Sequence, residues 1–294
     1  MTLDAYLQSE IDVGSFPSAS YAIGSLRSIE REHALGNAVV VPMRIAATAD
    51  TIYDVASLTK VLVTTILTLQ AIAEKKIALD DDYRGYTYRE LLTHTSGLAA
   101  WLPLYTYDDY VRGALENGPE YKRGTRVVYS DLNFVLLWSA LGELFGDYAA
   151  AARERIFEPL GLRDTLFHPP IALRPRIAAT EFGQRWEHGM CARRSVVFTG
   201  FRDGLMWGDT NDGNAHHAGG TAGNAGLFAT ARDVFRIVQA FASGELVPRE
   251  IVEESTRNHT AGMEDGRGLG WQKPTGSVAT SMLSDDAYGH TGFT

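Results

Sequence analysis

The sequence predicts an α+β fold in which an antiparallel sheet is joined to a mostly helical insertion. Two strand-like stretches near the N-terminus, 19–24 and 34–41, flank a polar link and indicate the sheet. An apolar run at 61–73 contains neither Gly nor Pro and does not alternate as a strand would, so it predicts a buried helix. Between about residues 83 and 190, helical patterns dominate and convincing strands are few.

The pattern of the first half of the chain predicts a helix, then a pair of strands and then further helices. Residues 1–12 repeat apolar side chains at helical spacing, and Gly14 to Pro17 ends that helix. The buried helix begins near Ser57 and ends near residue 76, where basic residues occupy its last turn. Further helical patterns cover 88–92, 107–117, 131–145 and 148–157.

The second half begins with a loop-rich region and a glycine-rich stretch at 200–226. Thr230 and Asp233 have the spacing of a helix N-cap, and the helix behind them runs to Gly244. Residues 268–273 and 277–283 are typical of late strands.

Composition excludes several classes of function. The chain has 294 residues, a formal net charge of −9 and no cluster of Lys and Arg, which argues against nucleic acid or an anionic membrane surface as a partner. The run 61–73 is too short and too rich in Thr for a membrane span. The single cysteine, Cys191, excludes an internal disulfide. Residues 1–8 do not resemble a signal peptide, so we expect a cytoplasmic protein, or a periplasmic or secreted one if a leader was removed.

The pair Ser57 and Lys60 is the main candidate for chemistry. Residues three apart share one face of a helix, so the hydroxyl and the ammonium can meet. Free N–H groups in the first helical turn favour a developing negative charge, and a buried lysine tends to lose its proton. Such a lysine can activate a weak hydroxyl nucleophile. A Ser N-cap followed by an ordinary lysine explains the same pair, and S-x-x-K alone is common by chance.

Two further motifs add to this pair. Tyr-Ser-Asp at 129–131 precedes an apolar helix, and His-Thr-Gly at 290–292 lies on an expected strand. With Ser-Leu-Thr-Lys at 57–60, their order resembles the serine hydrolases that include class C β-lactamases, low-molecular-weight penicillin-binding proteins and DD-carboxypeptidases, and related esterases. Supporting stretches that resemble the same family are 91–98, 159–162, 218–220 and 225–230.

This resemblance implies a fold and a set of catalytic roles. Residues 1–82 and 216–294 would form the sheet domain flanked by helices, and 83–215 the mostly α-helical insertion, with the site between them. Ser57 would be the acylated nucleophile, and Lys60 and Tyr129 would share the proton transfers. The oxyanion hole would consist of the backbone N–H groups of Ser57 and Phe293.

The resemblance also implies a substrate-binding set. His290, Thr291 and Gly292 would border the cleft, and Asp131 would contact the substrate or pair with Lys60. Many relatives have Asn where this chain has Asp131 and Lys where it has His290. A carboxylate only accepts hydrogen bonds, and a neutral histidine attracts a substrate carboxylate weakly. Both changes favour an esterase or peptidase over efficient penicillin hydrolysis.

No metal or other cofactor is predicted. Residues 209–220 begin like a calcium loop, but Gly stands at the fifth and twelfth positions, and the neighbouring histidines His216 and His217 point apart in most backbones. The absence of G-x-S-x-G argues against an α/β-hydrolase. Two functions stay open: a serine hydrolase acting on an amide or ester, and a catalytically weak relative that binds peptidoglycan-like peptides or acts as an assembly module.

The end of the sequence carries one more expectation. Relatives continue past His-Thr-Gly, whereas this sequence stops at Thr294. We therefore expect a shortened form of low activity, with an open sheet edge that a homodimer would cover.

Overall fold

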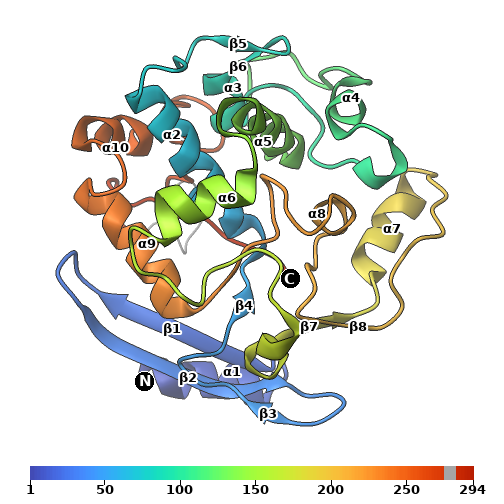
Figure 1. Ribbon diagram of the computed structural model, residues 1–294, viewed down its shortest axis with the longest axis vertical. Coiled ribbons are helices and arrows are strands. Elements are labelled where there is room, and N and C mark those ends of the chain that lie inside the picture. The colour runs from blue at the N-terminus through green and yellow to red at the C-terminus, as the bar shows by residue number, and fades with distance from the viewer. Residues whose placement is uncertain (275–282) are drawn as a thin grey trace.

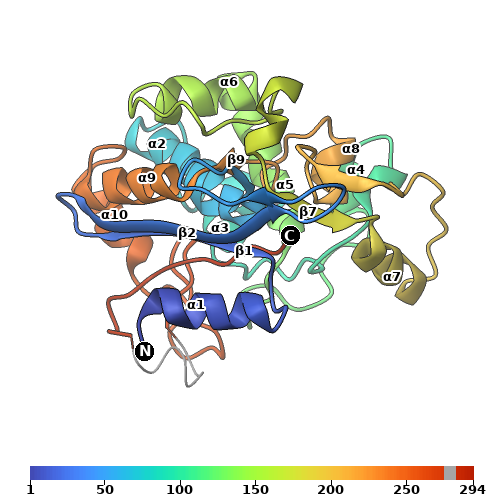
Figure 2. The ribbon, with the colours of Figure 1, turned by 90° about the horizontal axis from the view of Figure 1, so that it is seen from below.

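The computed structural model describes residues 1–274 and 283–294 and confirms the α+β fold. Strands β1 (Ser18–Gly24), β2 (Ile29–Val39) and β3 (Ile45–Ala46) form an antiparallel sheet in that order. Helix α1 (Leu3–Asp12) lies on one side of this sheet and α9 (Ala231–Ser243) on the other, as Figures 1 and 2 show from two directions. The sheet is therefore enclosed between helices.

The second strand is longer than predicted. It begins at Ile29 rather than near residue 34, because the polar residues before that point also pair with β1, with His33 opposite Tyr21 and Glu32 opposite Ala22. Several of these side chains are exposed, so they carry no apolar pattern that would have indicated a strand.

Three small antiparallel pairs complete the strands. They are β4 (Tyr53–Asp54) with β9 (Phe228–Ala229), β5 (Asp82–Tyr83) with β6 (Tyr86–Thr87), and β7 (Ala179–Phe182) with β8 (Leu205–Trp207). The predicted late strand at 268–273 appears as isolated bridges from Gln272 to Arg267 and Gly289. Residues 275–282, which contain most of the other predicted late strand, lie outside the described part.

Helices α2 (Thr65–Ala73) and α5 (Asp131–Phe145) form the centre of the molecule (Figure 1). Their apolar side chains are buried on nearly every face, which agrees with the continuous apolar pattern of both segments. The other α-helices are α3 (Tyr88–Leu92), α4 (Tyr110–Leu115), α6 (Tyr148–Ala152), α7 (Arg185–Arg193), α8 (Gly213–His217) and α10 (Arg249–Thr256), with 3₁₀ turns at Leu104–Thr106 and Ile171–Arg176 and a π turn at Arg153–Phe157.

The central hydrophobic cluster joins both parts of the proposed domain division. It contains Leu67 from α2, Leu91 from α3, Phe134 from α5 and Phe241 from α9. The division into 1–82 with 216–294 and 83–215 stays a prediction. What the packing shows is one continuous core beneath both parts.

The predicted helix that begins near Ser57 consists of three different turns. A 3₁₀ turn, Ala56–Leu58, is followed by a π turn, Lys60–Thr64, and only then by α2. Contacts of Thr64 explain part of this change of helix type. Its hydroxyl donates to the carbonyl of Gly223 at 2.6 Å and lies 2.7 Å from the hydroxyl of Tyr148. Single π turns occur often at functional sites.

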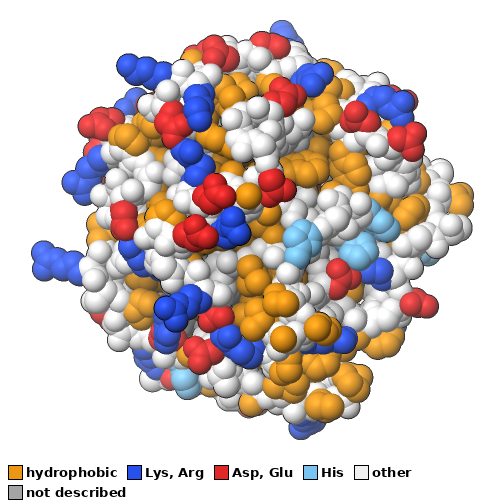
Figure 3. All heavy atoms as spheres, viewed as in Figure 1, with side chains coloured by type: hydrophobic (Ala, Val, Ile, Leu, Met, Phe, Trp, Pro, Cys, Tyr) orange, Lys and Arg blue, Asp and Glu red, His pale blue; other side chains and the backbone are white. Residues whose placement is uncertain are grey.

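One helical stretch, Ala56–Ala73, is long and apolar enough to cross a membrane, but 78% of it is buried inside the protein. On the face drawn in Figure 3, acidic and basic side chains are interspersed with apolar ones.

Gly223 provides a test of the packing between the glycine-rich loop and α5. A Cβ atom there would lie 2.2 Å from the carbonyl oxygen of Phe134 and 2.7 Å from Cβ of Trp138. We expect Gly223→Ala to lower the free energy of unfolding by about 2 kcal/mol or more, because overpacking against a helix backbone cannot relax easily. Urea unfolding measures the change.

The matched control is Gly142→Ala, within α5, where an added Cβ meets nothing within 4 Å. This variant is expected to raise the stability by about 0.5–1 kcal/mol through helix propensity. Equal effects of the two substitutions would contradict the described packing.

Candidate active site

Ser57 lies directly after a backbone position with an unusual conformation. Ala56 has a φ of 47°, a left-handed value that costs a non-glycine residue on the order of 1 kcal/mol. The carboxylate of Asp54 holds this turn: it accepts hydrogen bonds from Ala56 N at 2.8 Å and from Asn211 N at 2.7 Å. Burial raises the pKa of Asp54 to about 6, although the two N–H groups oppose this. Asp54 therefore ties the serine turn to the opposite wall of the site.

Lys60 is fully buried, and three oxygen atoms lie within 3.0 Å of its Nζ. Its Nζ lies 2.9 Å from Ser57 Oγ, 3.0 Å from the carbonyl oxygen of Asn224 and 2.7 Å from Oδ1 of Asp131. The contact with Asp131 is an ion pair rather than a well-directed hydrogen bond, since Oδ1 forms no hydrogen bond with a described residue. Lys60 therefore donates to the serine hydroxyl and pairs with Asp131.

The charge of Lys60 is set by two opposing effects. Burial lowers its pKa, but the Asp131 carboxylate and the Tyr129 phenol outweigh burial, so the pKa is raised above its ordinary value. Lys60 is thus an ammonium in the resting site. The sequence had left open whether Asp131 contacts substrate or pairs with Lys60, and the geometry shows the pair.

Tyr129 lies beside this lysine and between two positive charges. Its ring centroid is 5.0 Å from Lys60 Nζ and 5.6 Å from Cζ of Arg267. The rings of His94 and His290 approach it at centroid distances of 4.8 and 5.7 Å. Ser57, Lys60 and Tyr129 therefore meet in one place, as the motif order predicts.

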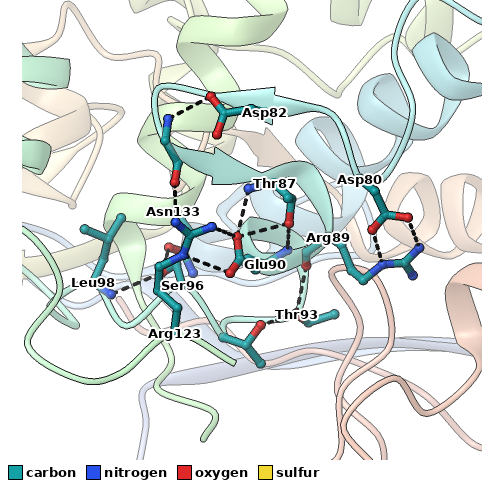
Figure 4. Close-up of polar contacts among 12 residues, drawn as sticks. Asp80, Asp82, Thr87, Arg89, Glu90, Thr93, Ser96, Leu98, Arg123 and Asn133 are labelled. Carbon is teal, nitrogen blue, oxygen red and sulfur yellow. Dashed lines mark hydrogen bonds and ion pairs between the residues drawn. The ribbon is translucent and has the colours of Figure 1, made fainter. Parts of the chain in front are cut away.

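The loop that precedes Tyr129 is held against α3 by Arg123. Its guanidinium donates to Gly85 O at 2.6 Å and to both carboxylate oxygens of Glu90. Glu90 in turn closes a capping box with Thr87 at the start of α3 (Figure 4). Below it, Ser96 Oγ donates to Oδ1 of Asn133 at 2.5 Å, so the turn at 93–98 is bonded to α5 (Figure 4).

His94 supports the Tyr-Ser-Asp segment from beneath. It has a φ of 58°, and its buried Nδ1 accepts the backbone N–H of Ser130 at 3.0 Å. Burial lowers the pKa of His94 well below its usual value, with Arg267 and Lys60 adding to the effect. His94 is thus a neutral acceptor that fixes the first turn of α5, as expected for a turn residue that satisfies backbone groups.

The predicted His-Thr-Gly segment lies against the serine turn. A Cβ at Gly292 would come 2.7 Å from Val55 O and 3.6 Å from Ser57 N, so Phe293 follows directly beside the nucleophile. His290 packs on Tyr129, and burial together with Lys60 lowers the pKa of His290 to about 3. Thr291 is exposed. The oxyanion role of the two N–H groups stays a prediction.

A cleft of about 380 Å³ opens in front of Ser57. Its lining includes Tyr129, Asp131 and Phe293 from the predicted set, whereas His290, Thr291 and Gly292 are not among the lining residues. The remaining lining residues are Ala56, Ala100, Trp101, Glu181, Trp186, Glu187, Met190, Asn211, Asp212 and Ala225. Across residues 1–274 and 283–294, no group of three or more His, Cys, Asp and Glu is arranged to hold a metal ion.

Comparisons with known proteins agree with this geometry. A sequence model described as "Beta-lactamase" matches residues 12–294. The chain belongs to the beta-lactamase family. Among curated proteins, it is similar to a putative D-alanyl-D-alanine carboxypeptidase of Escherichia coli K12, at 30% identity over 99% of this chain and 77% of that protein.

Two solved structures share the fold of this beta-lactamase family member. The octameric penicillin-binding protein homologue from Pyrococcus abyssi has a TM-score of 0.71 at 19% identity, and the match covers 92% of this chain and 64% of that chain. A class C beta-lactamase also has a TM-score of 0.71 at 19% identity, covering 95% and 76%. These likenesses confirm the fold that the three motifs imply.

Several site residues were not found from the sequence. Asp54 ends a short strand three residues before Ser57, and that proximity was the only available signal. Asn224 acts through its backbone carbonyl, which no side-chain pattern reveals. Glu187 lies on α7, far from every motif, and only the tertiary structure brings it to the cleft.

His94 provides a test of the support beneath Tyr129. A histidine held neutral in the fold stabilises the protein fully above its unfolded pKa of about 6.5, and this contribution is lost as the pH falls. His94→Gln keeps an acceptor for Ser130 N–H but cannot be protonated. Below about pH 6, the stability of the variant relative to the wild type is expected to rise by about 1.4 kcal/mol per pH unit. Urea unfolding between pH 8 and 5 measures this, and parallel curves for the two proteins over the whole range would be the contrary result.

Proposed function

We propose that this protein is a serine hydrolase that cleaves an amide or ester through an acyl-enzyme on Ser57. The observation that carries the proposal is the meeting of Ser57 Oγ, Lys60 Nζ and the Tyr129 ring at the bottom of one cleft. The family and the similarity to carboxypeptidases support it.

In the proposed first step, Ser57 Oγ attacks the substrate carbonyl carbon, and its proton is relayed through the Tyr129 hydroxyl, which takes that proton while it gives up its own. Lys60 is poorly placed to accept that proton, because its ammonium already donates to Ser57 and to two other acceptors. The Tyr129 ring lies beside the positively charged groups of Lys60 and Arg267. The proton that Tyr129 gives up passes to the departing nitrogen or oxygen as the bond of that atom to the acyl carbon breaks.

In the second step, water attacks the acyl carbon and releases the acid. The Tyr129 hydroxyl takes a proton from that water while its own proton passes to Ser57 Oγ, whose bond to the acyl carbon breaks, so the enzyme regains its starting state. The N–H groups of Ser57 and Phe293 would stabilise the oxyanion in both steps, each worth on the order of 10² to 10³ in rate.

A fluorophosphonate probe tests this assignment. The wild-type protein is expected to gain one covalent adduct on Ser57, found by peptide mass spectrometry, and Ser57→Ala is expected to gain none. Tyr129→Phe should slow labelling by a factor on the order of 10² to 10⁴, the usual size of general acid–base effects.

The control is Tyr121→Phe, which changes a partly exposed tyrosine outside the cleft lining and should label at the wild-type rate. Equal labelling of Ser57→Ala would remove Ser57 as the nucleophile. Folded wild-type protein that no serine-reactive probe labels would leave the alternative, a relative that binds peptidoglycan-like peptides without turning them over.

A further inference from the structure

The cleft in front of Ser57 has a strongly acidic lining. Carboxyl groups of Asp131, Glu181, Glu187 and Asp212 face it, and the described lining contains neither Lys nor Arg. The sequence of residues 275–282 contains no basic residue either. Apart from the ion pair of Lys60 and Asp131, the described lining therefore presents carboxyl groups and no basic side chain to a bound substrate.

Three of these carboxyl groups form no ion pair with a described residue. Glu187 is buried, and its Oε1 accepts Gly213 N at 2.5 Å. Asp212 accepts Ala215 N at 2.7 Å and lines the cleft. Burial raises the pKa of Glu187 to about 8 and the charge of Asp212 adds to this, whereas the hydrogen bond from Gly213 N and the charge of Arg202 oppose it.

Arg202 forms its ion pair with Asp209 and not with these groups. Arg202 donates to Asp209 Oδ2 at 2.8 Å and to the carbonyl oxygens of Thr210 and Asn211, at 2.5 and 2.7 Å. Its guanidinium is therefore bonded behind the cleft wall rather than to Glu187.

The positive groups around the nucleophile are already engaged. Lys60 donates to Ser57 and Asn224 and pairs with Asp131, and Arg267 binds Asp265 at 2.9 and 2.6 Å. His290 is neutral over the physiological range, since its pKa is about 3. A carboxylate on the substrate would thus meet three carboxyl groups without an ion pair to a described residue, and no lysine or arginine in the described lining.

Aromatic side chains at the mouth of the cleft add to this preference. Trp186 is 53% exposed and Phe293 is 68% exposed, and their ring centroids are 5.5 Å apart. The faces of such rings attract cations, by about 0.5–1 kcal/mol at exposed sites. Arg193 already lies over Trp186, with Cζ 5.7 Å from the ring centroid.

We propose that the cleft selects acyl donors that carry a positively charged amine near the scissile carbonyl, and that Glu187 and Asp212 bind this ammonium. Donors that end in a carboxylate are disfavoured. This inference rests on the proposed hydrolase function of Ser57 and adds the charge of its substrate. The proposed charge preference distinguishes the substrates of this chain from those of a carboxypeptidase, which end in a free carboxylate.

Three ethyl fluorophosphonates of similar length test the charge preference. Their alkyl groups are 3-aminopropyl, butyl and 2-carboxyethyl, so that the end of the chain is cationic, neutral or anionic. We expect the second-order rate of Ser57 labelling to fall in that order, with at least a tenfold difference between the cationic and anionic probes. Glu187→Gln combined with Asp212→Asn keeps both hydrogen-bond acceptors and should reduce that ratio at least tenfold.

Glu253→Gln, an exposed acid on α10, is the matched control and should leave the ratio unchanged. Labelling of Ser57 with equal rates for the three probes, or fastest with the anionic one, would overturn the charge inference and leave the hydrolase assignment intact. A ratio that the double variant does not change would remove Glu187 and Asp212 from the binding site. No labelling by any of the probes would overturn the hydrolase assignment, and the charge inference with it.

Discussion

The burial of the Lys60 ammonium is the constraint on which the rest of the site depends. An ammonium removed from water without partners costs several kcal/mol, so a buried one persists only where acceptors surround it. Here the acceptors come from three distant parts of the chain: Ser57 on the 3₁₀ turn, Asn224 in the glycine-rich loop and Asp131 at the start of α5. Satisfying one charge therefore joins three segments into one site.

In the proposed mechanism, the contacts of Lys60 also divide the chemical roles between Lys60 and Tyr129. A lysine that donates to the serine hydroxyl positions it, and a lysine paired with a carboxylate keeps its proton. In the proposed mechanism, the first proton transfer then falls to Tyr129, whose ring is flanked by His94, His290 and Arg267. The proposed charge preference follows the same logic, because Asp131 is paired with Lys60, whereas Glu187 and Asp212 have no ion-pair partner among the described residues.

The sequence could predict those features that depend on local pattern. The bounds of α5 match the predicted helix at 131–145, and α9 begins behind the Thr230 cap and ends at Gly244 with a φ of 83°. The order of three short motifs was enough to indicate the family. In each case, the pattern that allows the prediction lies in residues that are close together in the sequence.

The remaining features depend on contacts between segments far apart in sequence. The π turn at Lys60–Thr64 follows from side-chain contacts with Gly223 and Tyr148. The predicted helix at 107–117 is shorter, beginning at Tyr110 because the Asp109 side chain accepts Arg112 N. The acidic lining could not be predicted at all, since α7 and the 209–213 loop meet only in the folded protein.

The protonation state of Lys60 is the most direct test of this account. It can be followed by ¹⁵N NMR of the side-chain Nζ in protein with ¹⁵N-labelled lysine, assigned through Lys60→Met. The account predicts that Nζ keeps the chemical shift of an ammonium at pH 10, where ordinary lysines have begun to lose their protons, and that Asp131→Asn moves the titration to lower pH. A wild-type signal that shows a neutral amine at pH 8 would contradict it.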